Sequence, residues 1–232
     1  MRLRSRLLHP RKIVCVGLNY RDHAEEQGIL ESQLPSNPIV FSKYDRSLVG
    51  HDEIVEHPIV TKQLDYEAEL AIVIGKSGRF IAPGDVFDHI AGYACFNDIS
   101  ARDVQLADRQ WLHGKMGDTH APFGPWIVTK DEIDHPNSLS IQLTLNGEVL
   151  QDSNTSKMIF GIAEIVSFIS QSVTLDVGDV IATGTPSGVG FVRTSPVRLQ
   201  PGDKVSVAIG GIGVLANTVV DALNRDSPRV RA

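Results

Sequence analysis

LDYEAELAIVI, residues 64–74, is the stretch that decides the fold. Successive side chains of a β-strand point to opposite faces, and every second residue from Leu64 to Ile74 is aliphatic or aromatic. That face is expected in the core of a sheet. The other face carries Asp65, Glu67 and Glu69 before it becomes apolar. Carboxylates held side by side near a core repel one another and lose hydration, so the strand either binds a cation here or ends in solvent.

A divalent metal ion would relieve this repulsion. Carboxylates are hard oxygen ligands, which favour Mg²⁺ or Mn²⁺, with Ca²⁺ as an alternative, over Zn²⁺. A solvent-facing acidic strand end is the simpler interpretation. The spacing alone favours that interpretation, because an E-x-E pattern on a strand is common.

A third acid follows the next apolar strand, which is predicted over residues 89–96. Asp98 comes directly after this strand, and Ser100 stands where it could cap a following helix. Asp98 is therefore either a third metal ligand or a turn residue.

Arg102 and Gln105 lie three residues apart on the predicted helix and share one face. Arg102 can hold a substrate carboxylate through two hydrogen bonds. The alternative is a surface ion pair between Arg102 and either Asp103 or Asp108.

Strand patterns dominate the rest of the chain, so we predict an α+β fold that is mainly β, with short peripheral helices. Asn146-Gly147 predicts a tight hairpin, because both central positions need a positive φ. Helices are expected at 19–27, where Gly28 ends the helix, from about Ser100, and at 161–171. Strands are expected at 13–16, 39–42, 69–74, 89–96, 141–145, 180–183 and 204–209.

The composition of this 232-residue chain indicates one globular domain. The net charge of −6 has no basic stripe, which argues against nucleic acid as a partner. Cys15 and Cys95 lie in apolar stretches and are expected to be buried free thiols. No apolar run is long enough for a membrane span, and no signal-peptide pattern is seen, so a cytoplasmic location is expected. We predict an N-terminal arm at 1–11, a catalytic domain at 12–222 and a polar tail at 223–232.

An ordered set of motifs runs from about residue 12 to residue 220 and resembles the fumarylacetoacetate hydrolase family. The motifs are VGLNY at 16–20, DYEAELAIVIG at 65–75, NDISARD at 97–103, QWLHGK at 110–115, APFGP at 121–125, NGE at 146–148, MIF at 158–160 and TGTPSGVG at 183–190. The resemblance implies a mixed β-roll around a metal site, assembled as a homodimer. It also implies that Glu67, Glu69 and Asp98 ligate Mg²⁺ or Mn²⁺, and that Asp65 does not.

The chain looks closest to the short acylpyruvate hydrolase and oxaloacetate decarboxylase group of that family. In that group a lid helix carries a His and a Glu three residues apart, which His23 and Glu26 match. This spacing puts both side chains on one helical face, where Glu26 can orient the imidazole. Without the resemblance, such a pair on a helix would be expected in solvent.

Lys115, Arg102, Gln105 and Thr185 match the positions that hold the carboxylate and oxo group of the substrate. The resemblance also places Lys115 among the catalytic residues, with His23 and Glu26. The chain departs from the family pattern GKSFDTF at residues 114–120, where it reads GKMGDTH. We expect the changed residues to line the far end of the pocket.

These features predict a metal-dependent hydrolase that cleaves a carbon–carbon bond in an acylpyruvate or a related 2,4-dioxo acid. His23 and Glu26 would activate water, and the metal would stabilise a pyruvate enolate. An oxaloacetate-type decarboxylase and a 2-hydroxymuconate-like isomerase or decarboxylase are alternatives within the family. Outside the family, the alternative is a non-catalytic module that binds a metal ion or a carboxylate.

Overall fold

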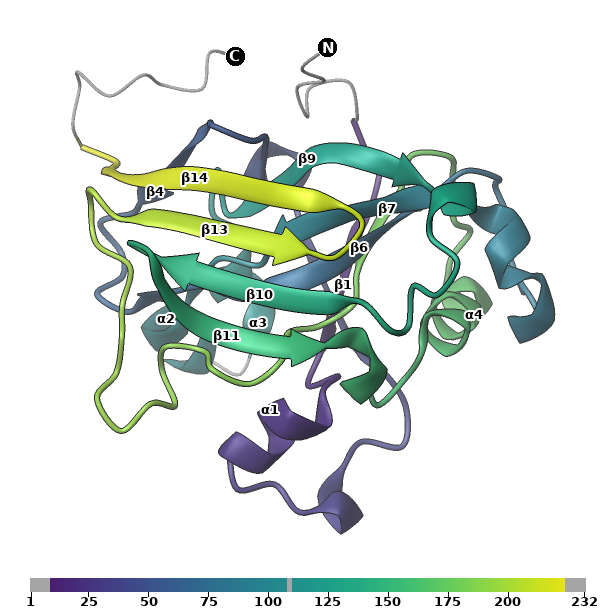
Figure 1. The fold of residues 1–232 in the computed structure, drawn as a ribbon, viewed down its shortest axis with the longest axis horizontal. Helices are drawn as coiled ribbons and strands as arrows, with labels where there is room; N and C mark the ends of the chain where they lie inside the picture. Colours follow the sequence, from purple (N-terminus) through teal and green to yellow (C-terminus); the bar gives the residue numbers. More distant parts are fainter. Residues whose placement is uncertain (1–8, 108–109, 224–232) are drawn as a thin grey trace.

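The computed structural model describes residues 9–107 and 110–223. Two twisted β-sheets form the body, and short helices lie at its periphery (Figure 1). The predicted α+β, mainly β fold is confirmed. Most of the predicted arm and tail, and Asp108, lie outside the described residues, and the proposed domain boundaries stay predictions.

The larger sheet has seven strands in the order β2-β1-β12-β6-β7-β9-β3. It is mixed, because β1 pairs with β12 and β3 pairs with β9 in parallel while the other pairs are antiparallel. Its strands are β1 (Ile13–Gly17), β2 (Ile39–Lys43), β3 (Leu48–Val49), β6 (Ala68–Ile74), β7 (Ile90–Asn97), β9 (Ala121–Thr129) and β12 (Val180–Ala182).

The second sheet has five strands in the order β11-β10-β13-β14-β4 and lies in front of β6 and β7 in Figure 1. Leu70 and Ile72 of β6 belong to the same buried cluster as Ile141, Leu143 and Val207 of the second sheet, so the main core lies between the sheets. The strands are β4 (Ile54–His57), β10 (Ser140–Leu145), β11 (Glu148–Asn154), β13 (Lys204–Ile209) and β14 (Gly213–Asp221). A separate ribbon pairs β5 (Leu64–Asp65) with β8 (Ser100–Ala101).

The described helices are short. The α-helices are α1 (Arg21–Glu26), α2 (Arg102–Ala107), α3 (Trp111–Lys115) and α4 (Ile162–Ser172). Single turns of 3₁₀ helix occupy Glu31–Gln33, Asp45–Ser47, Lys130–Glu132 and Thr155–Lys157, and a longer one occupies Pro83–His89. Among the described helices, none has the length and apolar character needed to cross a bilayer.

Most predicted elements are present, with three differences. The stretch 64–74 is not one strand, because residues 66 and 67 interrupt it between β5 and β6. Ser100 does not cap a helix: it lies in β8, its hydroxyl donates to the carbonyl of Asp98 at 2.8 Å, and α2 begins at Arg102. The strands β3, β4, β9 and β14 and the helix α3 were not predicted; β9 contains two prolines and a glycine, and β14 begins in a run of glycines.

The predicted turns are confirmed. Asn146 and Gly147 have φ values of 52° and 88°, and Leu145 pairs with Glu148 across them. Gly28 has a φ of 74° directly after the C-cap residue of α1, a conformation that glycine adopts without strain.

Candidate active site

Three carboxylates meet where β6 and β7 are paired. Glu67 lies between β5 and β6, Glu69 lies in β6, and Asp98 directly follows β7. The antiparallel register sets Ala68 opposite Asn97, and the amide of Asp98 donates to the carbonyl of Glu67 at 2.9 Å. One oxygen from each carboxylate lies within 4.8 Å of the others. All three residues are at most 6% exposed, so the interpretation as a solvent-facing strand end is wrong.

Two cations hold Glu67 in its charged form. The ammonium of Lys115 lies 3.0 Å from Oε2 of Glu67 and 2.9 Å from Oδ2 of Asp98. The guanidinium of Arg102 lies 2.6 Å from Oε1 of Glu67 and 2.9 Å from Oδ2 of Asp65. Burial alone would raise the pKa of Glu67, but these two positive charges outweigh burial and lower it to about 2. The proposed surface ion pair of Arg102 is wrong, because this side chain is buried.

Glu69 has the opposite electrostatic environment. Burial, together with the charges of Asp98 and Glu67, holds the pKa of Glu69 well above its ordinary value. Its Oε2 accepts one hydrogen bond, from the amide of Gly184 at 2.8 Å. Oδ1 of Asp98 is buried and, within the described residues, receives no hydrogen bond. A buried carboxyl that resists ionisation beside two other carboxylates is what a bound divalent cation would relieve, and the donor set is oxygen only. These residues therefore fit Mg²⁺ or Mn²⁺.

His23 and Glu26 form a pair on α1, in which His23 is buried and Glu26 is half-buried. Nδ1 of His23 lies 2.6 Å from Oε1 of Glu26, and the other oxygen of Glu26 accepts from the amide of Gly188 at 2.7 Å. His23 is 6% exposed, in contrast to the solvated pair expected from spacing alone. The imidazole is thereby oriented by a carboxylate that is itself held in place, an arrangement suited to a general base.

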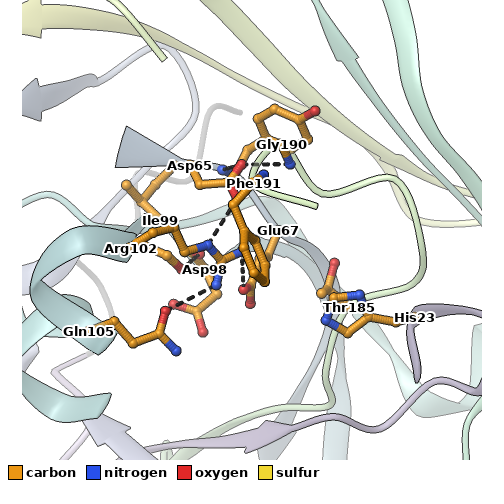
Figure 2. A network of polar contacts seen from close by, with 12 residues as sticks. His23, Asp65, Glu67, Asp98, Ile99, Arg102, Gln105, Thr185, Gly190 and Phe191 are labelled. Atoms are coloured by element: carbon orange, nitrogen blue, oxygen red, sulfur yellow. Dashed lines mark hydrogen bonds and ion pairs between the residues drawn. The ribbon is translucent and has the colours of Figure 1, made fainter. Parts of the chain in front are cut away.

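One cavity of about 250 Å³ brings the predicted substrate-binding residues together. In the close view, His23 and Thr185 lie on one side, Gln105 lies on the other, and Glu67 and Arg102 lie between them (Figure 2). A larger surface hollow, of about 590 Å³, lies around Phe87 and Ser138 and contains none of the predicted site residues. The smaller cavity is lined by His23, Glu67, Arg102, Gln105, Lys115 and Thr185, among others.

Comparison with known proteins decides the family. Residues 12–220 match the family described as Fumarylacetoacetate (FAA) hydrolase C-terminal. The chain belongs to the fumarylacetoacetate hydrolase family.

Several relatives in this family are named as tautomerases or isomerases. The chain is 48% identical to Oxaloacetate tautomerase YisK of Bacillus subtilis, over 90% of this chain and 69% of that protein. It is 47% identical to the mitochondrial Oxaloacetate tautomerase FAHD2A of Homo sapiens, over 91% and 67%. The crystal structure of 2-hydroxyhepta-2,4-diene-1,7-dioate isomerase from Mycobacterium marinum superimposes with a TM-score of 0.81 at 40% identity, covering 93% of this chain and 76% of that one.

The TGTPSGVG loop at 183–190 holds three carboxylates through backbone amides. Besides the bonds from Gly184 to Glu69 and from Gly188 to Glu26, the amide of Gly190 donates to Oδ1 of Asp65 at 2.9 Å. Asp65 thus anchors this loop and Arg102, and it stands apart from the metal cluster. A Cβ at Gly188 would lie 2.2 Å from the carbonyl oxygen of Leu150, and the φ of Gly188 is +100°, so this position requires glycine.

The departure from the family pattern at residues 114–120 does not shape the cavity as expected. Met116, Gly117 and His120 are not among the residues that line it. His120 is buried instead, and its Nε2 lies 3.1 Å from the carbonyl oxygen of Glu56. A Cβ at Gly117 would lie 2.4 Å from Nδ1 of His120, so the small residue makes room for the ring. Burial and the nearby charge of Lys43 lower the pKa of His120 to about 3.

Sequence reasoning missed two buried polar residues that support the site. Lys43 donates to the carbonyls of Ile99, Lys115 and His120 at 2.9, 2.7 and 2.7 Å. Gln151 donates to the hydroxyl of Thr185 at 2.9 Å and accepts from the amide of Ala68 at 2.9 Å. The one available signal for Lys43 was a lysine directly after an apolar strand pattern at 39–42.

Proposed function

We propose that this chain is a divalent-metal-dependent enzyme that interconverts the keto and enol forms of a small 2-oxo diacid such as oxaloacetate. The observation that carries the proposal is that one cavity is lined by both His23 and Glu67. A carboxylate-supported base therefore shares a space of small-molecule size with Glu67, the one carboxylate of the acid cluster among the residues that line this cavity. Two relatives named as oxaloacetate tautomerases support tautomerisation ahead of the hydrolysis that the motifs alone favour.

Separate groups of residues would bind the metal, bind the substrate and transfer the proton. Glu67, Glu69 and Asp98 would hold the metal, which when bound supplies electrostatic stabilisation for negative charge on the 2-oxo oxygen. Arg102 and Lys115 offer positive charge to the substrate carboxylate, and Gln105 and Thr185 offer hydrogen bonds to its polar head. Nε2 of His23 takes a proton from carbon 3 of the substrate, and Glu26 stabilises the imidazolium that results.

Acylpyruvate hydrolysis is the second candidate, and the His23–Glu26 pair supports it. The same base can take a proton from a water molecule that attacks a distal carbonyl, with a pyruvate enolate as the leaving group. Decarboxylation of oxaloacetate needs only the enolate-stabilising half of the site. Tautomerisation and hydrolysis are thus distinguished by what His23 deprotonates, whereas decarboxylation does not need His23 as a base.

A parallel assay tests these alternatives. Loss of the enol absorbance of oxaloacetate, formation of pyruvate from oxaloacetate, and cleavage of acetylpyruvate would be followed with Mg²⁺ or Mn²⁺ and with EDTA. We expect metal-dependent acceleration of the enol decay above the rate with metal alone. Faster cleavage of acetylpyruvate than enol decay would instead establish the hydrolase. Tight metal binding without turnover would point to the non-catalytic module.

Homodimer formation and a cytoplasmic location stay predictions. Light scattering coupled to gel filtration measures the first. Some relatives are named as mitochondrial proteins, so imaging of the tagged protein is needed to test the cytoplasmic location.

A further inference from the structure

Gln27, the residue after α1, contacts the candidate base directly. Its side-chain nitrogen lies 3.0 Å from Nε2 of His23 and 3.3 Å from the backbone oxygen of His23. Gln27 lines the cavity, yet as a residue it is exposed, so it stands at the rim. Neither the family resemblance nor the motif analysis assigns it a role.

The two contacts of His23 select one tautomer. An ionised carboxylate can only accept, so the 2.6 Å contact with Glu26 requires the proton on Nδ1. In a neutral imidazole, Nε2 is then an acceptor. The group of Gln27 that faces Nε2 is its amide nitrogen, a donor, which completes the same pattern.

We propose that Gln27 is a positioning residue that caps the base: its amide holds Nε2 of His23 unprotonated at the cavity, and it leaves Nε2 when the substrate enters. Because Gln27 is at the rim, its side chain can move into solvent without breaking packed contacts of the core. The role deepens the proposed function and rests on it for the kinetic consequences, but the tautomer itself can be measured without any activity.

The charges around His23 explain why a neutral donor suits this position. Glu26 contacts the ring from its own helix, and Glu67, Arg102 and Lys115 line the same cavity as His23. A third carboxylate, at position 27, would attract a proton to Nε2 and convert the base into a cation. An amide of the same shape satisfies Nε2 without that proton.

Nitrogen NMR of ¹⁵N-histidine-labelled protein without substrate tests the cap first, with His23→Gln used to assign the signals. We expect a protonated Nδ1 and a bare, hydrogen-bonded Nε2 at neutral pH. In Gln27→Glu both nitrogens should carry protons at the same pH. In Gln27→Met the tautomer should be retained, and the Nε2 signal should shift because its hydrogen bond is lost.

Kinetics provide the second arm, with the reaction that the enzyme proves to catalyse. In Gln27→Glu the acid limb of the kcat/KM profile should move up by about one pH unit or more, so that activity is lost at neutral pH and recovered at higher pH. In Gln27→Met the limb should move up by less, because Nε2 loses the donor that favours its neutral form but gains no carboxylate. Gln33→Glu is the matched control: Gln33 is exposed, accepts from the amide of Leu30 through its Oε1, and should tolerate the same change with unaltered kinetics.

A protonated Nε2 in the wild-type protein would overturn the cap whether or not the enzyme is active. An acid limb that is the same in Gln27→Glu and wild type would overturn it too. The expected NMR pattern without turnover on any 2-oxo acid would leave the cap standing and remove the proposed function.

Discussion

The ammonium of Lys43 lies 2.6 Å from Oδ1 of Asp98, and both side chains are fully buried. Because the three N–H groups of Lys43 point at carbonyl oxygens, this contact is an ion pair without a well-directed hydrogen bond. Lys43 thus joins the segment that ends β7 to the segment that ends α3. A single interior cation fixes the backbone from which a candidate metal ligand and Lys115 both project.

We expect Lys43→Met to destabilise the fold by roughly 3–5 kcal/mol, because it removes a buried cation from Oδ1 of Asp98 and a donor from three buried carbonyls. Urea unfolding measures this, with exposed Lys62→Met as a control that should change the free energy of unfolding by less than about 0.5 kcal/mol. A decrease of less than about 1 kcal/mol in the free energy of unfolding of Lys43→Met would show that Lys43 does not hold these two segments together.

Glu69→Ala should abolish metal-dependent turnover while leaving the fold intact. In the wild-type protein, Mg²⁺ or Mn²⁺ at about 100 times its Kd should stabilise the folded state by about 2.7 kcal/mol, because the ion binds only that state. Thermal unfolding with and without metal measures the effect, and the variant should show no shift. Exposed Glu25→Ala should keep the wild-type shift. Normal metal-dependent activity in Glu69→Ala would remove the metal hypothesis.

His23→Ala should lower the rate of tautomerisation or of acylpyruvate hydrolysis about 100-fold or more, since both need the base. Decarboxylation of oxaloacetate should fall much less, because it needs only charge stabilisation at the 2-oxo group. Parallel rates on the two kinds of substrate measure the difference, and circular dichroism checks the fold. Equal losses in all reactions would mean that the base is assigned wrongly.

His120 should make stability depend on pH. Its pKa is about 3 in the folded protein against an ordinary value of 6.5. The unfolded chain therefore binds the proton first, and the stabilisation present above pH 6.5 is lost as the pH falls toward 3. We expect the free energy of unfolding of wild type to fall, relative to His120→Gln, by up to about 1.4 kcal/mol per pH unit between pH 6.5 and about 4.

Urea unfolding at several pH values measures that slope. Exposed His135→Gln is the control and should keep the wild-type slope. Identical slopes in wild type and His120→Gln would contradict the buried, neutral state of His120.

Local patterns predicted the parts of this site that depend on spacing. Alternation correctly placed Glu69 on a strand, and the separation of three residues correctly predicted the contact between His23 and Glu26. Strand periodicity could not show that residues 66 and 67 interrupt the strand. That break lets β5 pair with β8 while β6 pairs with β7.

Contacts between distant segments were out of reach. Lys43 meets Asp98 and Gln151 meets Thr185 only because the sheets bring them together, and a single sequence carries no sign of that register. The expectation for residues 116–120 failed for a related reason. Residues close to Lys115 along the chain need not lie at the cavity, and the ring of His120 turns toward the carbonyl of Glu56 instead.

The glycine-rich loop at 183–190 sets the distance between two parts of the site. The amide of Gly184 binds Glu69 and the amide of Gly188 binds Glu26. The distance between the acid cluster and the base therefore depends on the four-residue spacing of these two amides along the backbone. One inserted residue can displace the second amide by up to about 3.5 Å relative to the first. Point substitutions elsewhere in the cavity can therefore change which substrate binds. A change in the length of this loop instead changes the distance between the base and a substrate held at the acid cluster.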